Sequence, residues 1–419
     1  MPSTPESFST LPIASCQQAL EDLLRKELPN SDLSSLKIQA GSNKGDNYSC
    51  IIYRAQVKTG NKSTVSIIAK LPPQDETRRN QFFVRACFER EILMYSEVFP
   101  MMMEFQRSKG VDPNEGFSHI PTYLQGSLTD HEEAIFMRDL CEEKFVMVDR
   151  FRIMTVDECL LMIRTLARFH AISFALKDQQ PERMKRFQQM SDILSLPEAD
   201  QLMQTFYAQM GARALGLLDE KQEPEVYTKT KRLLALSWTE LAKNLLAAEP
   251  AEPYAVIGQG DCWQNNLLYK YENGKPVDIR LLDWQCSRYG SPVLDLTYFI
   301  FLVTDKAFRD KYYEKLLSVY HTTLSEFVRR LGSDPERLFP WDAFQAQLLR
   351  FGHMGLVMAT IGLPIITTRP EDVPGLEGWS KQVQDGEITE QSFCSKDLEA
   401  VYRKNMTDCC RDMVRFGYI

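Results

Sequence analysis

Two carboxylates and an amide stand at a spacing that suits phosphoryl transfer. Asp261 and Asn266 stand five positions apart in IGQGDCWQNNLLYKYENGKPVDIRLLDWQ, residues 257–285, and Asp283 lies near the end of that segment. Phosphoryl transfer between hydroxyls needs one carboxylate to orient the acceptor hydroxyl. It also needs an amide and a second carboxylate to hold Mg²⁺ against the nucleotide phosphates. The D-x-x-x-x-N spacing, followed by a hairpin and a second Asp, matches the arrangement of kinase catalytic loops.

A hairpin should bring these side chains together. Asn273-Gly274, between two apolar strands, is the strongest two-residue hairpin signal. A turn centred there pairs positions whose numbers sum to 547, so Asn266 faces Leu281 and Asp283 lies two residues further on. Diagonal neighbours of this kind sit roughly 7–8 Å apart, close enough to share one or two metal ions. Pro276 can shift this register by one residue.

The N-terminal part of the chain should supply the phosphate-binding groups. Three strands are expected, the first ending at Ala40 and the others over about 49–57 and 64–71. Lys70, near the end of the third strand, can reach phosphates as a point charge. Glu91, on the following helix, can pair with Lys70, although Glu89 remains an alternative. Backbone N–H groups of the loop between the first two strands can cover phosphates. The candidate loop residues are Gly41, Ser42, Asn43, Lys44 and Gly45.

The remaining elements fall into two regions. Residues 15–28 predict an amphipathic helix, and about 79–98 predict another, with Pro100 beyond its end. Residues 134–137 form a short apolar strand. From about 155 the pattern is mostly helical, and residues 156–176 are apolar over so much of their circumference that we expect a buried helix. Further helices are expected within 197–247, 305–331, 341–360 and 395–416.

This order predicts an N-terminal extension with a helix (1–34), a strand-rich N-lobe (35–140) and a large helical C-lobe (141–419). A ligand cleft between two such lobes is a common arrangement. Residues 1–14 and 367–393 have the composition of a tail and a long loop.

The composition excludes some classes of protein. The 419 residues carry a net charge of -8, the opposite of the basic surplus expected of a nucleic-acid binder. The ten cysteines include no CxxC pair, which favours a reduced chain with free thiols. The N-terminus has no secretory pattern, and no apolar run reaches the ~18 residues of a membrane span. We therefore expect a cytoplasmic protein that binds neither nucleic acid nor membrane.

Several motifs resemble one known family. QGDCWQNN, LLDWQ and RYGSPVLDLTYF, together with SNKGDNYSCIIYRAQV, FEREILMYSEVFP, IFMRDL and LARFHAISFAL, are similar to the ecdysteroid kinase-like family of arthropods. That family belongs with choline kinases and aminoglycoside phosphotransferases in the protein-kinase-like fold. The resemblance covers roughly residues 35–350.

The resemblance implies an α+β, bilobal fold with a small antiparallel-sheet N-lobe. It implies that Asp261 is the catalytic aspartate, that Asn266 and Asp283 are Mg²⁺ ligands, and that Lys70 and Glu91 position the ATP phosphates. The connector that would hold adenine through its backbone comprises Met137, Arg138, Asp139 and Leu140.

One position departs from the family pattern. Gln259 stands where the family usually has a histidine that hydrogen-bonds the neighbouring backbone. Glutamine can also donate and accept hydrogen bonds, so we expect the loop to lose rigidity but keep its chemistry. His170 is expected in the core or between the lobes. Asp295 is expected to be a helix cap or a hydrogen-bond anchor.

The sequence thus predicts an ATP- and magnesium-dependent kinase for a hydroxylated small molecule, which the resemblance suggests is an ecdysteroid or a similar compound. Three alternatives remain. The chain could be a non-catalytic nucleotide- or ligand-binding relative, which Gln259 mildly favours. It could be a choline- or aminoglycoside-type kinase, although no acidic or aromatic cage for choline is visible. A protein kinase is disfavoured, because Asp283 is followed by Trp284-Gln285 and no Ala-Pro-Glu follows.

Overall fold

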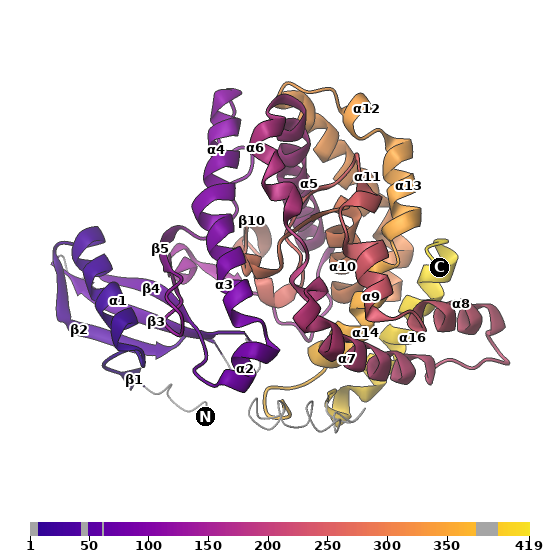
Figure 1. Cartoon of the computed structure of the whole chain (residues 1–419), viewed down its shortest axis with the longest axis horizontal. Helices are drawn as coiled ribbons and strands as arrows, with labels where there is room; N and C mark the ends of the chain where they lie inside the picture. The colour runs from indigo at the N-terminus through magenta and orange to yellow at the C-terminus, as the bar shows by residue number, and fades with distance from the viewer. Residues whose placement is uncertain (1–6, 43–48, 61–62, 374–392) are drawn as a thin grey trace.

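The computed structural model describes residues 7–42, 49–60, 63–373 and 393–419. A sheet with one helix across it occupies one side of the molecule, and a larger helical region occupies the other (Figure 1). The chain leaves the sheet at Leu71, forms helices over residues 84–108 that pack with the larger region, returns to the sheet over residues 123–138, and then continues in the larger region. The expected domain limits at residues 34 and 140 stay a prediction.

The N-terminal sheet has six strands in the order β1-β2-β3-β4-β6-β5, and every neighbouring pair is antiparallel. The three strands expected before residue 72 are all present. The strands are β1 (Ser7–Phe8), β2 (Ser31–Ala40), β3 (Ile51–Thr59), β4 (Thr64–Leu71), β5 (Tyr123–Ser127) and β6 (Ala134–Arg138).

Helix α1 (Ala14–Glu27) lies across this sheet (Figure 1). Its buried leucines, Leu20, Leu23 and Leu24, form one cluster with sheet residues such as Ile38 and Val57. The helix expected near residues 15–28 therefore packs directly on the strands, and it buries an apolar face that would otherwise be exposed.

The single helix expected over residues 79–98 is wrong. The structure has α2 (Glu76–Gln81), α3 (Val84–Leu93), a π-helical turn at Met94–Val98 and α4 (Phe99–Ser108). Phe83 adopts a left-handed conformation, with φ 51°, and breaks the helix after Gln81. Pro100 does not end the helical run, because it comes just after the π-helical turn, where the regular α-helical hydrogen bonding is already interrupted.

The expected hairpin is present, with its register corrected by one residue. β9 (Leu267–Glu272) and β10 (Lys275–Leu281) flank Asn273-Gly274, and β7 (Phe145–Met147) pairs with β9. The two residue pairs next to the turn have the predicted pairing, in which the residue numbers sum to 547. A bulge between Pro276 and Asp278 shifts the remaining pairs by one residue. The Leu282 N–H consequently donates to the Asn266 carbonyl at 2.9 Å, so Asn266 lies nearer Asp283 than predicted.

The helical region surrounds a short two-stranded sheet, β8 (Val256–Gly258) and β11 (Arg288–Gly290). The helices are α5 (Val156–Gln179), α6 (Pro181–Lys185), α7 (Pro197–Leu215), α8 (Pro224–Leu234), α9 (Trp238–Leu241), α10 (Pro292–Val303), α11 (Lys306–Arg330), α12 (Pro335–Leu338), α13 (Trp341–Phe351), α14 (Met354–Ile366) and α16 (Glu399–Arg415).

Within the described residues, one helix has the length and hydropathy of a membrane span, a feature that the sequence did not predict. This helix is α5, and 83% of its most apolar window is buried inside the fold. The bent pair of α13 and α14 passes the same test only if it is counted as one span. Burial of α5 agrees with the core helix predicted over residues 156–176.

Candidate active site

The loop that carries Asp261 follows β8 and depends on a glycine. Gly260 has φ 91°, a conformation that L side chains rarely adopt. A Cβ added there would lie 1.9 Å from the carbonyl oxygen of Cys286. The backbone of this loop therefore packs against the segment after Asp283 at a distance that excludes any side chain.

Asp295, in the first turn of α10, anchors the same loop. Its carboxylate accepts hydrogen bonds from the backbone N–H of Gln259 at 2.6 Å and of Gly260 at 3.1 Å. His170 Nε2 lies 3.3 Å from this carboxylate, and Arg288 donates to it at 3.3 Å. Burial would raise the pKa of Asp295, but His170 and Arg288 hold it below the usual value. The expectation of a buried His170 and an anchoring Asp295 is met.

Gln259 joins the two halves of the site. Its side-chain amide donates to the carbonyls of Leu282 at 2.9 Å and Asp283 at 3.2 Å. Its side-chain oxygen accepts from the N–H of Asp261 at 2.7 Å. Glutamine thus supplies the backbone hydrogen bonds expected of the family histidine, and it fixes Asp261 relative to Asp283.

Asp261 is held by two side-chain donors. Asn266 Nδ2 donates to Oδ2 at 2.7 Å, and the hydroxyl of Tyr298 donates to Oδ1 at 2.6 Å. Burial, and then the charge of Asp283, raise the pKa of Asp261 to about 6 in spite of these hydrogen bonds. A carboxylate with such a pKa is a suitable proton acceptor near neutral pH.

Lys70 lies between two carboxylates. Its ammonium is 2.5 Å from Glu91 Oε2 and 2.5 Å from Asp283 Oδ1, and Lys70 and Glu91 are both buried. Burial alone would lower the pKa of Lys70, but Asp283 and Glu91 raise it well above its ordinary value, so Lys70 stays charged. Glu89 points away and pairs with Arg85 at 2.7 Å, which leaves Glu91 as the partner of Lys70.

A cavity of about 330 Å³ lies between the sheet and the hairpin. The predicted residues that line it are Gly41, Ser42, Lys70, Glu91, Met137, Arg138, Asp139, Leu140, Asn266 and Asp283. Asn43, Lys44 and Gly45 lie outside the described residues. The Asp139 carboxylate accepts from Arg54 at 2.6 Å and Ser66 at 2.8 Å, so its side chain supports the connector.

A second cavity, of about 230 Å³, opens on Asp261, and we call it the acceptor pocket. Asn266 and Asp283 line both cavities, whereas Asp261 lines only the acceptor pocket and Lys70 only the first cavity. Among the described residues, Asp261 and Asp283 are the only charged side chains that line the acceptor pocket. Its apolar walls include Phe82, Phe83, Leu194, Met203, Phe206 and Ile361.

The oxygens of Asn266 and Asp283 fit a magnesium ion. Mg²⁺ prefers oxygen ligands and is usually bound through one or two protein groups together with substrate phosphates. The Asn266 Nδ2 is used by Asp261, which leaves the Oδ1 oxygen for a cation. Within the described part of the chain, no cluster of three or more His, Cys, Asp or Glu residues forms an alternative all-protein metal site.

Sequence reasoning missed two residues at this site. Tyr298 reads as one more apolar position in helix α10, and only the need of a buried hydroxyl for a partner hinted at its contact with Asp261. Gln285 follows the second aspartate closely, donates to Asp283 Oδ2 at 3.0 Å and accepts from Ser49 at 2.9 Å. No spacing rule marks either residue.

The family match, together with this arrangement of sheet, helical region and site, makes the chain a small-molecule phosphotransferase that acts on a hydroxyl group. The chain belongs to the ecdysteroid kinase-like family, whose sequence model matches residues 44–333. The predicted family, fold class and type of enzyme are therefore confirmed. A search of curated proteins found no significant match.

Solved structures similar to this chain include several kinases. The GDP complex of an aminoglycoside 2'-phosphotransferase-IIIa variant has 9% identity and a TM-score of 0.43, and the match covers 96% of this chain and 98% of that one. Macrolide 2'-phosphotransferase MphH from Brachybacterium faecium has 14% identity and a TM-score of 0.38, with coverage of 94% and 96%. A microcompartment-associated aminopropanol kinase has 11% identity and a TM-score of 0.38, with coverage of 96% and 99%.

Proposed function

We propose that this protein transfers the γ-phosphoryl group of ATP to a hydroxyl on an apolar, ecdysteroid-like skeleton. The observation that carries the proposal is the acceptor pocket, whose walls are largely apolar and which opens on the carboxylate of Asp261. Apolar walls with a few polar groups are typical of sites that bind a ring system and fix one reactive group.

Each polar residue has a distinct role in this proposal. Asp261 orients the acceptor hydroxyl and accepts its proton, while Tyr298 and Asn266 hold the carboxylate in place. Asn266 and Asp283 hold Mg²⁺, which when bound neutralises charge on the phosphates. Lys70 contributes a fixed positive charge to the phosphates, and Glu91 keeps it in position. The residues line two adjoining cavities, which suits direct transfer without a phosphorylated enzyme.

The pocket disfavours cationic acceptors. An aminoglycoside carries several positive charges and needs several carboxylates, and choline needs an acidic or aromatic cage. The carboxylates that line the described part of this pocket, Asp261 and Asp283, are already assigned to the acceptor hydroxyl and the metal ion. Burying further positive charge against Phe82, Met203 and Ile361 would be costly, because these side chains offer no compensating partner.

Product analysis with a mixed acceptor panel tests the proposal. The protein is incubated with Mg-ATP and ecdysteroids, choline, aminoglycosides or hydroxylated xenobiotics, and the products are examined by mass spectrometry. We expect a mass increase of one phosphoryl group on a steroid or another apolar alcohol. Phosphorylation of choline or an aminoglycoside alone would reject the apolar acceptor. Mg-dependent ATP binding without any product would instead favour the non-catalytic relative.

The pH dependence of turnover should report the ionisation of the Asp261 carboxylate. Its carboxylate must be ionised to accept a proton, and its pKa is raised to about 6. The value of about 6 includes the charge of a metal-free Asp283, which bound Mg²⁺ would offset, so we expect kcat/KM with Mg-ATP to be level at neutral pH and to fall at a pH below about 6. The measurement is a pH profile of kcat/KM under saturating Mg-ATP. A profile with no acidic limb down to about pH 4 would contradict the assignment of Asp261 as proton acceptor.

A further inference from the structure

Gln81, at the end of α2, is a polar residue of the acceptor pocket that finds no partner within the described part of the chain. Its side chain lines the pocket, and both Nε2 and Oε1 are buried without a hydrogen bond to residues 7–42, 49–60, 63–373 or 393–419. Among the described residues that line this pocket, no other side chain has a buried polar atom in that state. A buried amide without a partner is unfavourable, so such a group in a binding site indicates a missing ligand atom.

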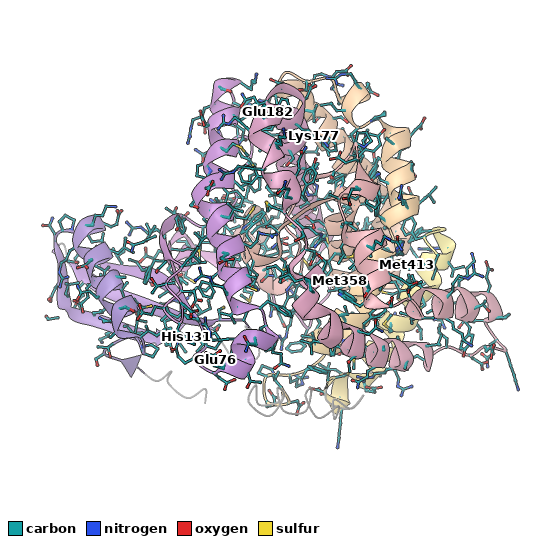
Figure 2. All side chains as sticks on the ribbon, viewed as in Figure 1. Glu76, His131, Lys177, Glu182, Met358 and Met413 are labelled. Carbon is teal, nitrogen blue, oxygen red and sulfur yellow. The ribbon has the colours of Figure 1, made fainter. Side chains whose placement is uncertain are left out.

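The helix that carries Gln81 is firmly held. Glu76 and His131 lie side by side at the lower edge of the molecule (Figure 2), and His131 Nε2 is 2.9 Å from Glu76 Oε1. Arg79 is buried and donates to the buried carboxylate of Glu133 at 2.8 Å. These contacts fix α2 against the loop between β5 and β6. Gln81 is therefore presented to the pocket from a preorganised position.

The turn after Gln81 shapes the same wall. Phe83 has φ 51° and ψ 38°, a left-handed conformation that is rare for an aromatic residue. The turn places Phe82 and Phe83 beside Gln81 in the lining of the pocket. Strained backbone of this kind persists where the surrounding structure enforces it, often at ligand sites.

We propose that the Gln81 amide binds a second polar group of the acceptor, apart from the hydroxyl at Asp261. The inference rests on the proposed function, and it narrows the substrate class. The acceptor is an apolar skeleton with at least two oxygen functions, one of which receives the phosphoryl group. The amide offers both a donor and an acceptor, which suits a hydroxyl or a hydroxyl beside a carbonyl.

The test combines Gln81→Met with single-deoxy analogues of one ecdysteroid, each lacking one hydroxyl other than the one phosphorylated. Methionine keeps the length of the side chain and removes its hydrogen-bond donor and acceptor. We expect one analogue to lose at least about 10-fold in kcat/KM with the wild type, because the amide is left unpaired. Gln81→Met should lose a similar factor with the parent steroid and show no further loss with that analogue.

Two outcomes separate this inference from the proposed function. If Gln81→Met lowers kcat/KM by the same factor with the parent steroid and with every deoxy analogue, the two changes act independently. The inference is then wrong and the proposed function stands. If the wild type phosphorylates none of the steroids, the proposed function fails and the inference fails with it.

A measurement without acceptor gives an independent check. Gln81→Met should raise the unfolding midpoint of the ligand-free protein, because it removes an unpaired buried amide. Asn80→Ser, which changes an exposed residue of the same helix for one of similar helix propensity, should leave the midpoint unchanged. A lower midpoint for Gln81→Met would mean that Gln81 has a structural partner, and the proposal would be overturned.

Discussion

Asp261→Asn should abolish turnover while leaving ATP affinity within a few-fold of the wild type. General base catalysis typically contributes 10²–10⁴-fold, and asparagine cannot accept the proton of the acceptor hydroxyl. Nucleotide binding should persist because Asp261 lines the acceptor pocket and not the cavity that contains Lys70. The measurements are steady-state kinetics and a nucleotide titration in the presence of Mg²⁺.

The same variant should be more stable than the wild type when no ligand is bound. The pKa of Asp261 is raised from 3.8 to about 6, so the folded protein binds this proton more tightly than the unfolded chain does. The ionised group therefore destabilises the fold as pH rises through that window, by at most about 3 kcal/mol at neutral pH. The partial exposure of Asp261 lowers this figure.

Glu272→Gln is the matched control for Asp261→Asn, because it removes an exposed carboxylate from the same hairpin. It should change neither turnover nor stability. Loss of nucleotide binding in Asp261→Asn would contradict the roles assigned here, since it would place Asp261 on the metal side of the site.

Asp283→Ala should have the complementary effect and weaken Mg-dependent nucleotide binding directly. Losing a residue that only supports a metal ligand commonly costs 10–100-fold in metal affinity, so we expect a loss on the order of 100-fold for a ligand.

The backbone at Asp283 requires a second variant. Asp283 has φ 56°, and alanine tolerates this left-handed conformation less well than asparagine does. Asp283→Asn therefore separates loss of the charge from loss of the fold. Nucleotide titrations at increasing Mg²⁺ should show a weaker response in both variants. An unchanged Mg²⁺ dependence in both would exclude Asp283 as a ligand.

The phosphate-transfer half of the site is the half that sequence patterns predict well. Asp261, Asn266 and Asp283 lie within 23 residues and are joined by a hairpin whose Asn-Gly turn is a strong local signal. Lys70 and Glu91 follow from a strand and the next helix. The one-residue register shift that Pro276 was expected to allow is present, as a bulge between Pro276 and Asp278, although the sequence alone did not show that it would occur.

The acceptor half could not be predicted in the same way. Gln81, Leu194, Met203, Ile361 and Asp261 meet in one pocket although they come from distant parts of the chain. Each apolar member reads as ordinary core in its own helix, and its position depends on tertiary packing. The left-handed Phe83 is equally hidden, since no local residue preference favours an aromatic side chain there.

The two cavities also differ in how freely evolution can alter them. The loop that carries Asp261 depends on a glycine with no room for a Cβ and on a carboxylate that anchors two backbone N–H groups, so few substitutions preserve it. Most of the acceptor walls come from α2 and the turn after it, from the short helix that contains Leu194, and from α7 and α14, and these segments carry none of the residues assigned to the phosphates. Gene copies could therefore diverge toward new acceptors by changing wall residues alone while they inherit the same transfer chemistry.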